Sequence, residues 1–232
     1  MIIFMSSSLE HKITTCVLCP RLVQWRQDIG QIKVRRFQDD TYWAKPVAGF
    51  GSLQAECLIV GLAPAAHGAN RTGRMFTGDR SGEWLYRALA KQGFANQAES
   101  NHRKDGLKLH NCFITAVLHC APPQNKPAKD EITNCRRFFS SEFRQLKRLR
   151  VMICLGQIAF KETLCLLESE LQIKFTPKPK FSHGNTFKTS RDLTIIGSYH
   201  PSQQNTFTGK LTEEMFDTVF RKALHILNKS QD

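Results

Sequence analysis

The chain of 232 residues contains no apolar run close to the ~20 residues that a membrane-spanning helix needs. Its first eight residues have neither a basic stretch nor an apolar segment long enough for a signal peptide, so we expect a cytoplasmic protein with no membrane association. A Gly-x-Ser-x-Gly motif and a Walker-type phosphate loop are also absent. These absences disfavour a small-molecule hydrolase on an α/β scaffold.

Acidic residues are few relative to basic ones. The chain has 20 Asp and Glu against 33 Lys and Arg, which gives a formal net charge of +13 at pH 7. An excess of this size favours a polyanionic partner such as nucleic acid, because each neutralised phosphate releases counterions. The basic residues are scattered and not gathered on one amphipathic helix, which disfavours a membrane surface. The alternative is a basic soluble protein whose charge has no specific partner.

The eight cysteines fall into two groups, and without a secretory signal we do not expect disulfides. One group lies in or beside apolar runs, where cysteine behaves as a small buried hydrophobic residue; it comprises Cys57, Cys112, Cys154 and Cys165. In the other group, Cys16 and Cys19 form a Cys-x-x-Cys pair, and Cys120 and Cys135 bracket a proline-rich segment. These four are candidate metal ligands. Their spacing alone fits a zinc ion as well as an iron–sulfur cluster.

Short apolar runs alternate with helical patterns along the chain. The runs at 57–61, 112–118, 151–156 and 193–197 predict buried strands. Helices are predicted at 81–92, 129–150, 157–171 and 211–227. This alternation predicts a three-layer α/β/α fold with a central, mostly parallel four-stranded sheet. We expect one domain over residues 1–232, in which residues 1–50, with a helix around 18–28, form an N-terminal extension packed on the rest.

Three of the segments that follow these strands are rich in small, polar and basic residues. They cover residues 61–79, 119–127 and 198–206. In sheets of this kind, ligands bind at the carboxyl ends of the strands. The sequence therefore predicts a binding site where these three loops meet.

These loops resemble those of the uracil-DNA glycosylase superfamily, and in particular its iron–sulfur-containing type-5 branch. The resemblance covers nearly the whole chain. It includes the Cys-x-x-Cys pair, the segment 35–51, Gly-Leu-Ala-Pro-Ala-Ala-His-Gly from Gly61, Gly-Arg-Met-Phe-Thr-Gly-Asp ending at Asp79, and His-Pro-Ser-Gln-Gln-Asn-Thr from His200. It implies a monofunctional glycosylase that flips a damaged base out of DNA, hydrolyses its N-glycosidic bond and leaves an abasic site. We expect the protein to be a monomer.

The resemblance implies two catalytic residues. His200, directly after a predicted strand, would donate a hydrogen bond to a base carbonyl as negative charge develops there. Other branches carry Asp or Asn at the position of Ala63, so Asp79 is the carboxylate left to activate water. Asp79 could instead cap the helix that begins near Ser81. A purely structural histidine is the corresponding alternative for His200.

The base pocket would combine an aromatic ring with a floor of main chain and small side chains. Phe76 would stack on the flipped base, the alternative being a core phenylalanine. The floor would comprise Gly61, Ala63, Pro64 and Ala65. Other branches carry an Asn near the end of the second strand to read a pyrimidine edge, and residues 115–118 contain none. We therefore expect activity on uracil opposite guanine and on at least one other base, with hypoxanthine as the first candidate.

Further residues are expected to contact DNA or hold the cofactor. The DNA-contact candidates are Asn70, Arg71, Arg74, Asn125, Lys126 and Lys210, while the tip formed by Gln203, Gln204 and Asn205 would fill the space left by the flipped base. Cys16, Cys19, Cys120 and Cys135 would bind a structural [4Fe–4S] cluster that ties the N-terminal extension to the domain. The alternative function is a non-catalytic DNA-binding protein with a structural zinc ion held by the same four cysteines.

Overall fold

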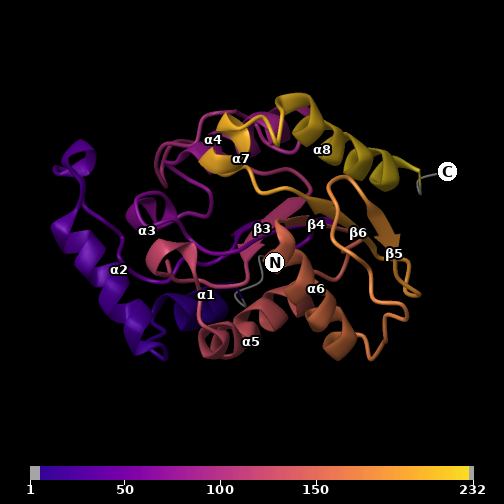
Figure 1. Ribbon diagram of the computed structural model, residues 1–232, viewed down its shortest axis with the longest axis horizontal. Helices are drawn as coiled ribbons and strands as arrows, with labels where there is room; N and C mark the ends of the chain where they lie inside the picture. Colours follow the sequence, from indigo (N-terminus) through magenta and orange to yellow (C-terminus); the bar gives the residue numbers. More distant parts are fainter. Residues whose placement is uncertain (1–5, 230–232) are drawn as a thin grey trace.

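The computed structural model describes residues 6–229, and a central β-sheet lies between two layers of helices (Figure 1). The strands are β1 (Phe50–Gly51), β2 (Cys57–Gly61), β3 (Cys112–Ala116), β4 (Val151–Leu155), β5 (Thr186–Lys188) and β6 (Thr194–Ser198). The α-helices are α1 (Ser6–Thr14), α2 (Pro20–Ile32), α3 (Ala69–Thr72), α4 (Arg80–Lys91), α5 (Lys129–Gln145), α6 (Gln157–Glu170), α7 (Gln203–Phe207) and α8 (Glu213–Asn228). Two 3-10 helices, η1 (Arg35–Phe37) and η2 (Pro123–Asn125), complete the elements. Among residues 6–229, no helix has the length and apolar character needed to cross a membrane.

The sheet has six strands in the order β1-β3-β2-β4-β6-β5. Its four central strands are parallel, with Ile59 of β2 opposite Ile114 of β3 and Ile153 of β4. These are the four predicted strands, so the α/β/α fold with a mostly parallel sheet is confirmed. The edge strands β1 and β5 pair antiparallel and bring the total to six instead of four. They are two and three residues long and partly exposed, so they lack the apolar run that marks a buried strand.

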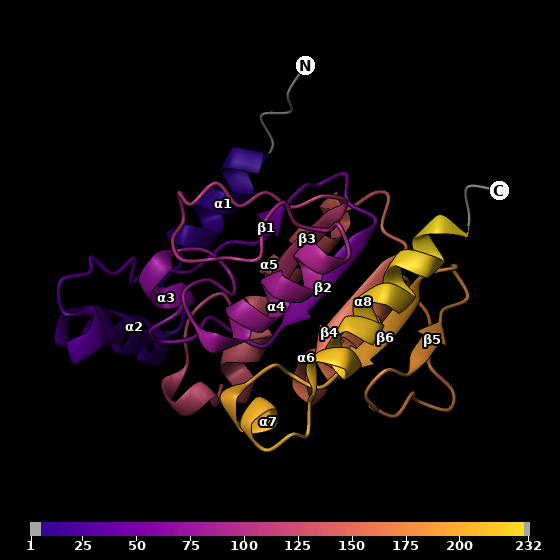
Figure 2. The same cartoon turned by 90° about the horizontal axis from the view of Figure 1, so that it is seen from above.

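Two hydrophobic cores lie on opposite faces of the sheet. In β2, Cys57 and Ile59 pack toward the residues of α4 and α8, whereas Leu58 and Val60 pack toward α5 and α6. The alternation follows from the two-residue period of a strand. Figure 2 shows α4 and α8 lying over one face. Because both faces are covered, every residue of the four central strands is buried, which explains their continuous apolar runs.

The predicted helices are all present, with shifted ends. The helix predicted at 129–150 ends at Gln145, because Leu146 leaves the helical region with ψ 75° and is itself buried. The helix predicted around 18–28 runs over Pro20–Ile32, and the proline fits its first turn. The helices α1, α3 and α7 were not predicted; the latter two have only four and five residues.

The N-terminal extension packs on the loops at the carboxyl edge of the sheet. The backbone N–H groups of Trp43 and Ala44 donate to the carbonyls of Arg71 and Asn70 at 2.9 and 3.0 Å. The N–H of Val47 donates to the carbonyl of His119 at 2.7 Å. The extension therefore touches two of the three predicted site loops through main-chain hydrogen bonds.

Candidate active site

Phe76 lies over the end of β2. A Cβ atom added to Gly61 would come within 2.7 Å of Phe76 Cζ, so the ring needs a glycine at that position. Phe76 is only 8% exposed and has a φ of +52°, a left-handed conformation that is costly for a bulky side chain. Such a conformation persists only where the surrounding structure imposes it.

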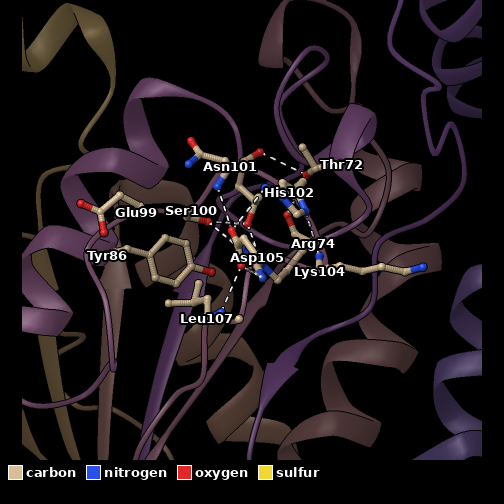
Figure 3. A network of polar contacts seen from close by, with 12 residues as sticks. Thr72, Arg74, Tyr86, Glu99, Ser100, Asn101, His102, Lys104, Asp105 and Leu107 are labelled. Atoms are coloured by element: carbon tan, nitrogen blue, oxygen red, sulfur yellow. Dashed lines mark hydrogen bonds and ion pairs between the residues drawn. The ribbon is translucent and has the colours of Figure 1, made fainter.

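A buried polar network holds the segment around Phe76 (Figure 3). Arg74 forms a two-pronged ion pair with Asp105 at 2.8 and 2.7 Å, and both side chains are nearly inaccessible to solvent. Arg74 also donates to Thr77 and Ser100 at 2.9 and 3.1 Å. Burial alone would raise the pKa of Asp105, but the hydrogen bonds from Arg74 and from backbone N–H groups outweigh it and hold that pKa well below its usual range. The network therefore anchors the residues on both sides of Phe76.

Asn70, Arg71 and Arg74 do not face solvent as the DNA-contact prediction requires. Asn70 is 1% exposed, and its amide donates to the carbonyls of Arg26 and Ala66. The guanidinium of Arg71 donates to Asp40 at 2.6 Å and to two backbone carbonyls. All three side chains thus bind the protein itself and are not available to contact phosphates.

His200 follows β6 and lies beside Phe76. The two ring centroids are 6.0 Å apart and the ring planes are tilted by 31°. Desolvation lowers the pKa of His200 to about 4, so the imidazole is neutral at pH 7. The side-chain amide of Asn205 donates to the His200 carbonyl at 2.8 Å and thereby positions the histidine.

An open cavity of about 370 Å³ lies next to His200. It is lined by Leu62 from the loop after β2, by residues 155–159 from the β4–α6 connection, and by Asn205 and Lys210 beyond β6. Two of the three predicted loops, 61–79 and 198–206, thus meet at this cavity together with the β4–α6 connection, whereas residues 119–127 do not line it. The volume lies within the range of ordinary ligand pockets.

Asp79 is the N-cap of α4, as one of its two predicted roles requires. Its Oδ1 accepts a hydrogen bond from the N–H of Gly82 at 2.9 Å. Its Oδ2 lies against the loop after β2, where a Cβ on Gly68 would approach it to 1.9 Å. Desolvation raises the pKa of Asp79, although the backbone N–H groups of Gly82 and Ser81 act in the opposite direction.

The remaining polar candidates lie on the outer ends of the loops. Asn125 and Lys126 are exposed after β3, and Gln203, Gln204 and Lys210 are exposed around α7. Phe207, at the end of α7, is 72% exposed and was not identified from the sequence as a candidate for DNA contact. Its signal in the sequence is a phenylalanine between Thr206 and Thr208 in an otherwise polar segment, where no apolar period supports a core position.

The four candidate metal ligands line one small cavity between α2, α5 and the segment after β3. Each sulfur accepts a hydrogen bond from nitrogen. The donors are Arg26 Nη1 to Cys120 at 2.9 Å, the His119 N–H to Cys135 at 3.3 Å, Arg137 Nη2 to Cys16 at 3.6 Å and Asn134 Nδ2 to Cys19 at 3.7 Å. Hydrogen bonds of this kind surround the thiolate sulfurs of iron–sulfur clusters and tune their potentials.

Burial raises the pKa of Cys120 to about 11 and raises the pKa of Cys135 and Cys19 above the usual value as well. These groups would be protonated thiols at neutral pH without a bound metal, so metal loading must release protons. Within residues 6–229, no three His, Cys, Asp or Glu side chains are arranged around a single ion position. Of the other cysteines, Cys57, Cys112 and Cys154 are buried and Cys165 is half-buried.

Comparison with known proteins places the chain beside DNA repair enzymes. The family model of the uracil DNA glycosylase superfamily matches residues 48–224. The type-5 uracil-DNA glycosylase of Mycobacterium tuberculosis is 46% identical over 216 residues, which cover 93% of this chain and 79% of that protein. The type-5 enzymes of Thermus thermophilus and Pyrobaculum aerophilum are 43% and 38% identical, covering 91% and 92% of this chain and 93% and 89% of those proteins.

Proposed function

Because the chain belongs to the uracil DNA glycosylase superfamily, we propose that it is a DNA repair glycosylase that hydrolyses the N-glycosidic bond of uracil in DNA. The bond between C1′ and the base nitrogen breaks, water supplies the new oxygen on C1′, and an abasic site remains. The observation that carries the proposal is the placement of Phe76 and His200 side by side at the carboxyl edge of β2 and β6. We further propose that the protein acts as a monomer in the cytoplasm.

The base would enter the site after rotation out of the helical stack. Phe76 offers a flat ring for stacking, and the Arg74–Asp105 network keeps that ring in its strained backbone conformation. The main chain and small side chains at Gly61, Ala63, Pro64 and Ala65 would form the floor against which the base rests.

His200 would stabilise the departing base. As the bond to C1′ breaks, negative charge develops on the base carbonyl, and a neutral imidazole N–H can donate to that oxygen. Burial keeps the imidazole neutral, as the pKa of about 4 indicates. Asn205 supports this arrangement because it holds the backbone of His200.

Asp79 would act on the water while still capping α4. One carboxylate oxygen is occupied by the Gly82 N–H, and the second faces the first loop. A carboxylate with a raised pKa is a better base than an ordinary one, provided that it remains ionised. We propose that this second oxygen orients the attacking water.

The pocket would tolerate more than one base. Residues 115–118 are all buried, and the hydroxyl of Thr115 is used in a hydrogen bond to Glu142. Discrimination by large factors needs buried polar groups that a wrong base leaves unpaired. We therefore propose that the enzyme also removes hypoxanthine, and that ease of unstacking contributes to its choice.

DNA would lie across the loop ends at this edge of the sheet. The exposed side chains of Asn125, Lys126 and Lys210 would contact phosphates, and the net charge of +13 favours the approach of a polyanion. Gln203 and Gln204, together with the exposed ring of Phe207, would fill the space left by the flipped nucleotide.

We propose that Cys16, Cys19, Cys120 and Cys135 bind a structural [4Fe–4S] cluster. Support comes from the common cavity and from the nitrogen donor on each sulfur. The cluster would join α2 to α5 and thereby tie the extension to the domain, next to the Arg21–Glu131 ion pair that already links them at 2.7 Å. When bound, it supplies no step of the hydrolysis in this proposal.

The experiment is incubation of the purified protein with duplexes that carry uracil, hypoxanthine or ethenocytosine, followed by alkaline cleavage of abasic sites. An undamaged duplex of the same sequence is the control. Strand cleavage confined to the lesion supports the proposal. Tight DNA binding without any abasic site would favour the non-catalytic alternative with a zinc site.

A further inference from the structure

Arg26 of α2 is a buried cation that forms no ion pair with a carboxylate among residues 6–229. Its side chain is part of a residue only 4% exposed. Nη1 donates to Cys120 Sγ at 2.9 Å, Nη2 donates to the backbone carbonyl of Cys16 at 3.2 Å, and Nε has no partner within the described chain. A guanidinium is always protonated in proteins, so this position holds a permanent positive charge.

The one acidic residue that lines the same cavity, Glu131, pairs with Arg21 and not with Arg26. Glu131 accepts two hydrogen bonds from Arg21, both at 2.7 Å, and a third from the N–H of Ala128 at 2.7 Å. Its charge is therefore balanced by Arg21. A buried charge without an opposite charge strongly destabilises a fold. An anion bound next to Arg26 would therefore stabilise the protein.

We infer that Arg26 is the buried counter-cation of the iron–sulfur cluster and raises its reduction potential. The inference rests on the proposed [4Fe–4S] site. Four thiolates around a [4Fe–4S]²⁺ core carry a total charge of −2, and uptake of one electron makes it −3. A fixed positive charge stabilises the more negative state more strongly, so Arg26 favours the reduced cluster. Arg26 would also raise the reduction potential if the redox couple were between the 2+ and 3+ cores, because the reduced state is again the more negative one.

Arg137 provides an internal comparison. It also donates to a ligand sulfur, Cys16, but at 3.6 Å and from an exposed position on α5. Solvent screens an exposed charge much more than a buried one. Loss of Arg137 should therefore change the potential less than loss of Arg26.

The test measures the reduction potential of the purified, iron-loaded protein by voltammetry at an electrode, for Arg26→Gln, Arg26→Lys and Arg137→Gln. We expect Arg26→Gln to reduce the equilibrium constant for cluster reduction at least about tenfold, a fall of 59 mV for one electron. Arg26→Lys keeps the charge and should recover most of this loss. Arg221→Gln is the control, because it removes an exposed cation on α8 that pairs with Glu214; its potential should equal that of the parent.

An unchanged potential in iron-loaded Arg26→Gln would overturn the inference. So would an equal fall in Arg26→Lys and Arg26→Gln, because geometry and not charge would then be the cause. If Arg26→Gln loses its iron, retention by Arg26→Lys supports the inference and loss from both contradicts it. Zinc or no metal in the parent protein would overturn the cluster and this inference together, while the assay for abasic sites would still test the glycosylase.

Discussion

The ring of Phe76 lies 6.0 Å from the ring of His200, although the first residue belongs to the loop after β2 and the second follows β6. Both side chains depend on their neighbours for this placement. Phe76 stays in a left-handed conformation because Arg74 and Asp105 hold its segment, and His200 is tied through its carbonyl to Asn205. In the proposed function, the pair would provide one stacking surface and one neutral hydrogen-bond donor at the same edge of the sheet.

Gly61→Ala should disable this pair and leave the fold intact. The added methyl would come within 2.7 Å of Phe76 Cζ, so the ring must move from its place. We expect the single-turnover rate on a uracil duplex to fall by about tenfold or more, since loss of positioning near reacting atoms is costly. Arg221→Gln, which changes an exposed side chain of α8 outside the site, serves as the control and should keep the parent's rate. A rate equal to that of the parent would show that the Phe76 ring is not needed where it lies.

Asp79→Asn should separate the two roles of Asp79. Asparagine caps helices as well as aspartate does, so stability should change little. It cannot act as a base, however, so the rates on uracil and hypoxanthine should fall in similar proportion. A loss confined to one substrate would instead make Asp79 a residue that recognises the base.

The pH profile of the parent should show an acid limb that the Asp79→Asn variant lacks. The ionised carboxylate is the active form, so the rate falls as the pH decreases through the pKa of Asp79. Desolvation raises that pKa, which places the limb above the ~3.9 of a free aspartate. Protonation of His200 lowers the rate only when the pH approaches the pKa of His200, which is about 4. A profile that is the same in both proteins would contradict the role of Asp79.

The central strands, and the edge of the sheet at which the loops after them lie, could be predicted because their signals are local. An apolar run such as 57–61 marks a strand buried on both faces, and the loops that follow parallel strands must share one edge. The orientation of Arg74 could not be predicted in this way. Its partner Asp105 lies 31 residues further along the chain, and nothing in the sequence around Arg74 distinguishes an inward side chain from an exposed one. The edge strands β1 and β5 could not be predicted for the same reason, because their pairing depends on residues distant in the sequence.

The substrate range tests the character of the pocket. Because the Thr115 hydroxyl donates to Glu142 and the proposed floor consists of small residues, we expect cleavage of both uracil opposite guanine and hypoxanthine. The measurement compares kcat/KM on duplexes that differ only in the lesion. A preference for uracil over hypoxanthine beyond about 10⁴-fold would reveal a specific contact to the uracil edge.

Metal analysis tests the cysteine site. After anaerobic purification we expect iron and inorganic sulfide in equal amounts, and a brown protein. Removal of the iron by chelation should lower the thermal stability, because α2 would lose its link to α5 through the four sulfurs. Zinc in place of iron would contradict the proposed cluster.

The measurement that tests the central claim most directly is the single-turnover rate of base release from a uracil-containing duplex by the parent and by His200→Ala. Removal of one preorganised donor to the departing base should cost about 10²-fold or more in rate. The affinity for the duplex should change little, and His110→Ala, which removes an exposed histidine, should behave as the parent. Rates of the parent and His200→Ala that agree within about threefold, or a parent that binds the duplex and releases no uracil, would contradict the account.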